Sequence, residues 1–172
     1  MRRHRIGTSL YAGVLFVVLG TLAWASGQPF IFPSLGPSAF ILAFQRDSDR
    51  TGLASVVVSH LVGGVAGLIA YSLLAGGVSL FADPAAFSTA GLRLVASATL
   101  SIVATSWGMI ATDTVHAPAC ATTLIVSLGL LSTPGQVAII VAGVVVLVAF
   151  HALALSAYHR ATDPARPGLV DG

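Results

Sequence analysis

The chain has 172 residues, of which 56% are hydrophobic and 8% are charged, and its mean hydropathy is +0.93. A soluble domain carries roughly 25% charged residues because its surface must be wet, so this composition excludes a soluble globular protein and predicts a polytopic membrane protein. Eight basic and six acidic residues leave a formal net charge of +2 without a basic stripe, and we therefore expect no nucleic-acid partner.

The order of elements follows from four runs that contain no Asp, Glu, Lys or Arg. These runs are Ile6–Gln45, Thr51–Ala82, Leu94–Thr112 and Thr114–His159. Each run has room for at least one helix of about 20 residues, the length that crosses a hydrocarbon core of roughly 30 Å. The sequence therefore predicts an all-α transmembrane helical bundle that forms a single domain over residues 1–172.

The first half is expected to hold two long helices with a shorter apolar piece between them. A helix over Thr8–Ser26 comes first, and we expect it to be retained rather than cleaved as a signal peptide, because no cleavage site followed by a soluble region is present. The shorter apolar piece covers Phe30–Gln45, and the polar segment Arg46–Arg50 follows it. A long helix then covers about Thr51–Ala75.

The second half repeats this order of parts. A Gly/Pro-containing connection over 76–89 leads to a helix over Ala90–Ala111, and the polar segment Thr112–Ala119 follows it. A short apolar piece then continues to about Leu131. After a turn over Ser132–Gly135 we expect a last helix over Gln136–Tyr158 and a polar, frayed tail over 160–172. The two halves cover about 8–75 and 90–158, and an offset of 81 places Pro37 on Pro118. The repeat is one of layout and not of residue identity.

The positions of the arginines favour six crossings. If both short pieces cross, the N-terminus, the Arg46–Arg50 segment and the C-terminal tail share one side, together with seven of the eight arginines. Because basic residues are enriched on the cytoplasmic side, we predict a cell-membrane protein with both termini cytoplasmic. It would contain two inverted three-span repeats, a plan found in secondary transporters. Four crossings with two re-entrant pieces are the alternative.

Each short piece is predicted to hold a proline-broken half-helix. In "FPSLGPSAF" (Phe32–Phe40), Pro33 and Pro37 disfavour regular helix before about Gly36, and Pro118 plays the same part in the second half. The two half-helix N-termini would meet near the membrane midplane, where free N–H groups and roughly half a positive charge each would suit a small anion. The residues predicted to bind the substrate are Ser34, Gly36, Pro37, Ser38, His116, Pro118, Ala119 and Thr122. Packed proline kinks without a ligand are the alternative.

Three ionisable residues are predicted to couple protons or to gate: His60, Asp113 and His116. Such groups are costly at membrane depth and tend to mark pathways, and a histidine titrates close to neutral pH, so His116 could carry a proton with an anion. Asp113 is either the partner of His116 or a surface residue, and His60 is either functional or a packing residue. His151 is expected to pack or to lie at the interface.

No pattern in the sequence predicts an enzyme. The chain has no nucleophile elbow, no phosphate-binding loop and no set of ligands with metal-site spacing, so we expect no catalytic residues, no cofactor and no metal. The single cysteine, Cys120, cannot form an internal disulfide. The Gly63/Gly67 pair is a small-residue face that lets helices approach closely, and we expect a chain this small to form a homo-oligomer.

Three stretches resemble, in the same order, the blocks of the HPP family of integral membrane proteins. They are "GPSAFILAF" (Gly36–Phe44), "SHLVGG" (Ser59–Gly64) and "HAPACATTL" (His116–Leu124). The resemblance covers about Phe32–Leu131 and departs from the family at Ala117, where the first proline of the motif would stand. It implies a small multi-span protein with His60, His116 and Pro118 at motif positions. Some plant and cyanobacterial members are linked to nitrite transport.

The sequence therefore favours a transporter or channel for a small inorganic monoanion, most of all nitrite, with the lipid bilayer as its surroundings. A pore for a neutral solute is the first alternative, because paired half-helices with prolines also suit that function. A membrane scaffold subunit that transports nothing is the second.

Overall fold

The fold is described by a computed structural model that covers residues 2–45 and 51–162. Within these residues the chain forms helices and connections and contains no strand. The helices long and apolar enough to cross a membrane are α1 (Arg2–Ser26), α3 (Thr51–Ala70, continued by the π-helical turn Tyr71–Ala75), α4 (Thr89–Ala111) and α6 (Pro134–Thr162). The predicted all-α class is confirmed, and the protein is a membrane-embedded helical bundle.

Two short helices separate the long ones: α2 (Leu35–Phe44) and α5 (Ala119–Ser127). They have 10 and 9 residues, and at about 1.5 Å per residue each covers roughly half of a hydrocarbon core. Neither helix therefore crosses a membrane by itself, and each follows a non-helical stretch. The six crossings and the inverted repeat stay predictions.

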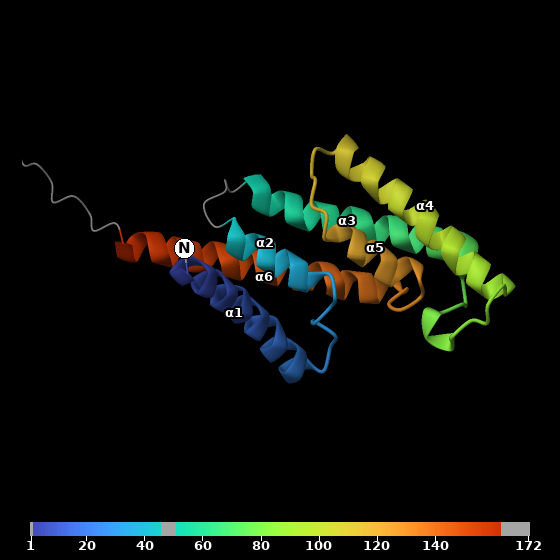
Figure 1. Ribbon diagram of the computed structural model, residues 1–172, viewed down its shortest axis with the longest axis horizontal. Helices are drawn as coiled ribbons and strands as arrows, with labels where there is room; N and C mark the ends of the chain where they lie inside the picture. The colour runs from blue at the N-terminus through green and yellow to red at the C-terminus, as the bar shows by residue number, and fades with distance from the viewer. Residues whose placement is uncertain (1, 46–50, 163–172) are drawn as a thin grey trace, which may run out of the picture.

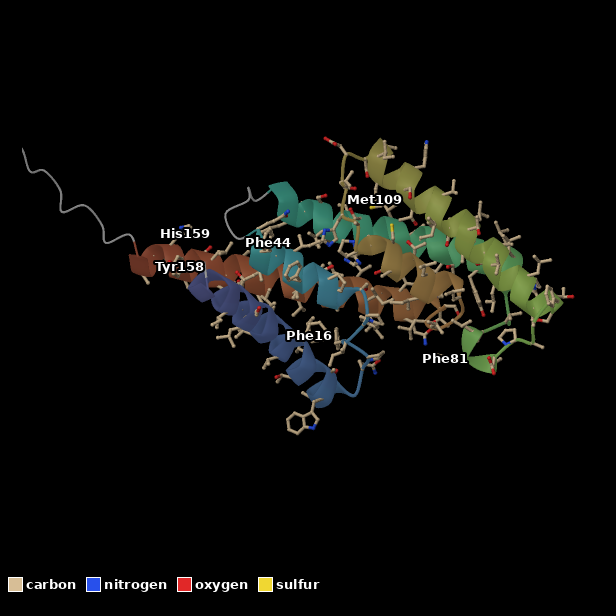
Figure 2. All side chains as sticks on the ribbon, viewed as in Figure 1. Phe16, Phe44, Phe81, Met109, Tyr158 and His159 are labelled. Carbon is tan, nitrogen blue, oxygen red and sulfur yellow. The ribbon has the colours of Figure 1, made fainter. Side chains whose placement is uncertain are left out.

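Helix α3 lies at the centre of the arrangement and packs against α4, α5 and α6, whereas α1 packs against α2 and α6. Figure 1 shows α1 and α4 on opposite flanks, with α2 and α5 between them. The start of α1 and the end of α6 lie at the same end of the molecule (Figure 1). Among the exposed aromatic side chains, Phe81 (83% exposed) lies toward one end of the molecule and Tyr158 (64% exposed) toward the other (Figure 2). Tyrosine is enriched at membrane–water interfaces.

The predicted long helices are all present, but α1 begins at Arg2 and not at Thr8, and α6 begins at Pro134, inside the predicted turn. Helix α4 begins one residue earlier than expected, and α6 continues through Thr162, so residues 160–162 of the predicted tail are helical. The remainder of that tail, 163–172, and the predicted segment Arg46–Arg50 lie outside the described residues.

The glycines of α3 allow a close approach to α5. A Cβ atom on Gly63 would lie 2.7 Å from the carbonyl oxygen of Ala119, and one on Gly67 would lie 2.8 Å from Cβ of Val126. Both distances are shorter than van der Waals contact, so only glycine fits at this helix spacing. The small-residue face is therefore covered inside one chain, and a homo-oligomer, which stays a prediction, would have to use another surface.

Candidate functional site

The residues before α2 determine where that helix begins. Proline lacks an N–H and fixes its own φ, so Pro33 disfavours a regular helix through this stretch. Helix α2 starts at Leu35, whose N–H donates to the carbonyl of Phe32 at 3.0 Å. Ser34 and Ser38 lie one turn apart and are fully buried, and the Ser38 hydroxyl donates to the Ser34 carbonyl at 3.0 Å. Both hydroxyls therefore belong to the interior of the bundle.

The start of α5 differs from what we predicted. The N–H groups of Ala119, Cys120 and Ala121 donate to the carbonyls three residues earlier, at 3.0, 3.0 and 3.1 Å. The first N–H groups of a helix usually lack a partner within it, and we expected them to be free for an anion. A tight turn at Pro118 (φ −57°, ψ −21°) brings the preceding carbonyls close enough to accept from these groups. That part of the prediction is wrong for α5, which leaves side chains as the donors.

Five polar side chains form what we call the histidine cluster, and they come from α2, α3, α5 and the connections before α2 and α5. They are Ser34, Ser38, His60, His116 and Thr122. Oγ of Ser38 lies 3.0 Å from Nε2 of His60 and 3.0 Å from Nε2 of His116. Oγ1 of Thr122 lies 2.7 Å from Nδ1 of His60 and donates to Oγ of Ser34 at 2.9 Å. The first turns of the two short helices are thus joined by their side chains.

The cluster is sealed inside the protein. His60 and the three hydroxyl residues are fully buried, His116 is 6% exposed, and the two imidazole ring centres are 5.4 Å apart. Within the described part of the chain, the hydrogen bonds of the two rings go to hydroxyls and none goes to a carboxylate. An unpaired polar group at membrane depth costs several kcal/mol, and here every hydroxyl has a partner. The result is a hydrogen-bonded polar centre in an otherwise apolar bundle.

Comparison with protein families agrees with this architecture. A family model described as "HPP, transmembrane region" matches residues 2–164. The chain belongs to the HPP family. The match extends the sequence resemblance from about Phe32–Leu131 to nearly the whole chain. Comparison with curated proteins and with solved structures gave no match.

The three residues at HPP motif positions lie close together. His60 and His116 are both members of the histidine cluster, and Pro118 forms the turn that starts α5. Ala117 stands where the resemblance places the first proline of the motif. It is exposed, and its carbonyl accepts a hydrogen bond from the N–H of Cys120 at 3.0 Å. The turn is therefore closed without that proline.

The remaining predicted site residues lie around the cluster or away from it. Gly36 is half-buried and Pro37 is exposed, whereas Ala119 is buried where its carbonyl approaches Gly63. Asp113 is exposed, with its backbone in the left-handed region at φ 52°. The described hydrogen bond of His116 goes to Ser38, so the structure does not bring Asp113 to His116 as a partner.

A stripe of hydroxyls on α4 was not predicted from the sequence. Ser97, Ser101 and Thr105 are fully buried at every fourth position, so they share one face of the helix. Oγ1 of Thr105 lies 2.8 Å from Oγ1 of Thr123, and Ser97 donates to the Ser127 carbonyl at 2.9 Å. The spacing of serine and threonine along α4 was the available signal. The stripe joins α4 to the helix that carries Thr122.

The third buried histidine, His151, lies in a different place. His151 of α6 is 2% exposed, and its Nδ1 lies 3.0 Å from the hydroxyl of Tyr11 on α1. It joins two helices as a packing residue does, and the described contact lies outside the histidine cluster.

Proposed function

We propose that this HPP protein moves a small inorganic monoanion, with nitrite as the expected substrate, across the membrane, and that the histidine cluster binds it. The observation that carries the proposal is the burial of two histidines and three hydroxyls between two proline-broken helices of an apolar bundle. Ionisable residues at this depth are costly and tend to mark pathways for ions and protons. Membership of the HPP family supports transport as the general function.

The chemistry of the cluster favours an anion over a cation. Imidazole N–H and hydroxyl groups donate hydrogen bonds, and the described bonds of the cluster include no carboxylate that would attract a cation. The Nε2 atoms of His60 and His116 converge on the position of Ser38 Oγ. An anion oxygen beside Ser38 would accept from the same donors, and bonds to a charged acceptor are about twice as strong as neutral ones. The cluster is compact, which favours a small anion.

We assign proton coupling or gating to His60 and His116. The charge of an imidazole changes between pH 5 and 8 when the ring is unperturbed, so these rings are the groups in the cluster that can change charge. Asp113 is exposed and apart from them, and we leave it out of this assignment. Gly36, Pro37, Pro118 and Ala119 then shape the two helix starts rather than donate to the anion.

The test is uptake of nitrite by liposomes that contain the purified protein, with the His116→Ala variant measured beside it. We expect uptake above that of protein-free liposomes, a strong loss in the variant, and a rate that changes with membrane potential or with pH. Uptake that depends on neither membrane potential nor pH would indicate a neutral-solute pore instead. Failure to take up any of several small anions would contradict the transport proposal and favour a scaffold subunit.

We also propose that both termini face the cytoplasm of a cell, which requires each non-helical stretch and its short helix to cross together. Seven of the eight arginines then share the cytoplasmic side. A single cysteine placed at Ser48 in a Cys120→Ala background should react with a membrane-impermeant thiol reagent from the same side as the N-terminus. Reaction from the opposite side alone would contradict six crossings and support re-entrant short pieces.

A further inference from the structure

The hydrogen bonds of the histidine cluster admit two arrangements, because a hydroxyl has one hydrogen to donate and two lone pairs that accept. In the first arrangement Ser38 donates to the Ser34 carbonyl, His60 Nε2–H donates to Ser38, and Thr122 donates to His60 Nδ1. In the second, Ser38 donates to His60 Nε2, His60 Nδ1–H donates to Thr122, and Thr122 donates to Ser34 Oγ. The proton of His60 therefore changes nitrogen between the two arrangements, while the Ser38 and Thr122 hydroxyl protons change acceptor and the heavy atoms keep their positions.

We propose that Ser38 relays protons between His116 and His60, and that this relay couples anion movement to a proton. The coupling, but not the relay, rests on the proposed function. Ser38 Oγ lies within hydrogen-bond distance of both Nε2 atoms, at 3.0 Å from each. These two hydrogen bonds link the rings. A proton can pass along such a chain while the helices stay packed.

One transfer through the second arrangement is balanced in protons. A proton binds to Nδ1 of His116, and the proton on Nε2 of His116 moves to Ser38 Oγ. The original hydroxyl proton of Ser38 moves to Nε2 of His60, and the proton on Nδ1 of His60 moves to Thr122 Oγ1. The original proton of Thr122 moves to Ser34 Oγ, whose own proton passes to a water molecule that enters from the Pro33 connection. One proton enters and one leaves, and rotation of the hydroxyls with a change of His tautomers restores the starting state.

The two ends of this chain lie next to different connections of the bundle. His116 is the cluster member with measurable exposure, and it follows Val115, which is 70% exposed. No hydrogen bond from Nδ1 of His116 is found within the described residues, so this atom is placed to exchange a proton. At the other end Ser34 follows Pro33, which is exposed. The connection before α5 and the connection before α2 reach the cluster from opposite flanks (Figure 1).

The groups around the two rings keep the relay free of competing charges. Helix α2 contributes Ser38, and Ser34 precedes that helix. Helix α5 contributes Thr122 and the half-buried thiol of Cys120, one turn beyond His116. The α4 stripe adds the uncharged hydroxyl of Thr105 against α5, and α6 meets α3 through Val137 at Gly64. The acidic group nearest in sequence, Asp113, is exposed. Within the described residues, the two imidazoles are therefore the groups of the cluster that can gain or lose a proton.

The experiment compares nitrite uptake with and without an inward proton gradient in liposomes at a fixed membrane potential. The measured quantity is the ratio of uptake with the proton gradient to uptake without it, and this ratio cancels any change in basal uptake. For one proton per anion, accumulation should rise by up to roughly tenfold for each pH unit of gradient. Ser38→Ala and Thr122→Val should lower the ratio to about one, because each removes a hydroxyl from the chain. Thr122→Ser, which restores the hydroxyl without added bulk, should recover the stimulation.

Ser101→Ala is the matched control, because Ser101 is also a fully buried serine and its hydroxyl donates within α4 to Ala98. It should keep the wild-type ratio. A normal ratio in folded Ser38→Ala and Thr122→Val, or a wild-type ratio of one with nitrite uptake intact, would overturn the relay and leave the proposed function standing. If the wild-type protein takes up no anion, proton flux is measured alone with a pH dye. Flux that Ser38→Ala abolishes would then support the relay, and flux absent from the wild type would overturn it.

Discussion

The molecule contains two sites in which a buried histidine contacts a hydroxyl group, and the two histidines have similar burial. His60 on α3 and His151 on α6 are 0% and 2% exposed, and Nδ1 of each lies within hydrogen-bond distance of a hydroxyl, at 2.7 and 3.0 Å. The two sites differ in their further contacts. His60 also contacts Ser38 through Nε2, and Ser38 leads to a second histidine, whereas the hydroxyl at His151 comes from Tyr11 and ties α1 to α6.

This comparison shows that burial and a hydroxyl partner do not by themselves indicate function. Both are what a polar residue needs inside a membrane, whatever it does there. What separates the sites is the number of elements that they join. The His60 site links α2, α3, α5 and the connections before α2 and α5 through five side chains. Replacing each histidine in turn is therefore the most direct way to test whether the distinction is functional.

The largest effect is expected from His60→Ala set against His151→Ala. Loss of the His60 ring leaves Ser38 and Thr122 without their shared partner, and we expect nitrite uptake per folded protein to fall by roughly tenfold or more. His151→Ala should reduce thermal stability, because it removes a buried side chain, but should leave the uptake per folded protein close to that of the wild type. Equal losses of uptake in both variants would remove the distinction between the two sites.

A second expectation concerns the packing of α3 against α5, which supports the His60 site and not the His151 site. In Gly63→Ala the new methyl group would meet the Ala119 carbonyl and Thr123 Oγ1, both at 2.7 Å, and should push α5 away from α3. We expect a loss of about 1–3 kcal/mol in unfolding free energy, as is usual for overpacking, together with reduced uptake, since Thr122 would move from His60. Thermal unfolding in detergent measures the first effect.

Gly13→Ala on α1 is the control for this experiment, because no atom lies within 4 Å of a Cβ placed at Gly13. In a helix interior alanine is favoured over glycine by about 1 kcal/mol, so this variant should be as stable as the wild type or more so. A Gly63→Ala protein that unfolds at the wild-type temperature would mean that α3 and α5 are less tightly packed than described.

The sequence contains enough information to place the spans and several cluster residues. Runs without charge mark the long helices, and Pro33 and Pro118 mark where the short helices begin, because proline has a local effect on the backbone. The connection through Ser38 was not predictable, since it joins residues 22 and 78 positions away in the chain. Asp113 shows the converse: it lies three residues from His116, yet its own backbone turns into the left-handed region after the end of α4, and its side chain is exposed.

The backbone hydrogen bonds at the start of α5 could not be predicted from the sequence either. Pro118 predicted a break correctly, but whether the next N–H groups point to a ligand or to the preceding carbonyls depends on how tightly the turn closes. Likewise, serine or threonine at every fourth position of α4 is compatible with a lipid-facing helix. Only the packing of α4 against α5 identifies these hydroxyls as buried.

A smaller effect is expected from Tyr11→Phe, which removes a hydroxyl from the His151 site and leaves the His60 site unchanged. A neutral hydrogen bond contributes about 1 kcal/mol, so the unfolding free energy should fall by roughly that amount while nitrite uptake and its stimulation by a proton gradient stay unchanged. Thermal unfolding and the uptake ratio are measured on the same preparation. Loss of stimulation in this variant would make the His151 site part of proton coupling and would end the distinction from the His60 site.

The smallest effect should come from Ala117→Pro, which restores the family's first motif proline at the edge of the histidine cluster. Ala117 is the first central residue of the turn that the Ala119 N–H closes on the His116 carbonyl at 3.0 Å, a position where proline is favoured. His116 is non-helical, as the residue before a proline should be. Because the unfolded chain loses freedom, stability should rise by about 0.4–1 kcal/mol, with uptake unchanged. Reduced uptake at higher stability would mean that motion of this turn, and not only the hydrogen bonds of His116, takes part in transport.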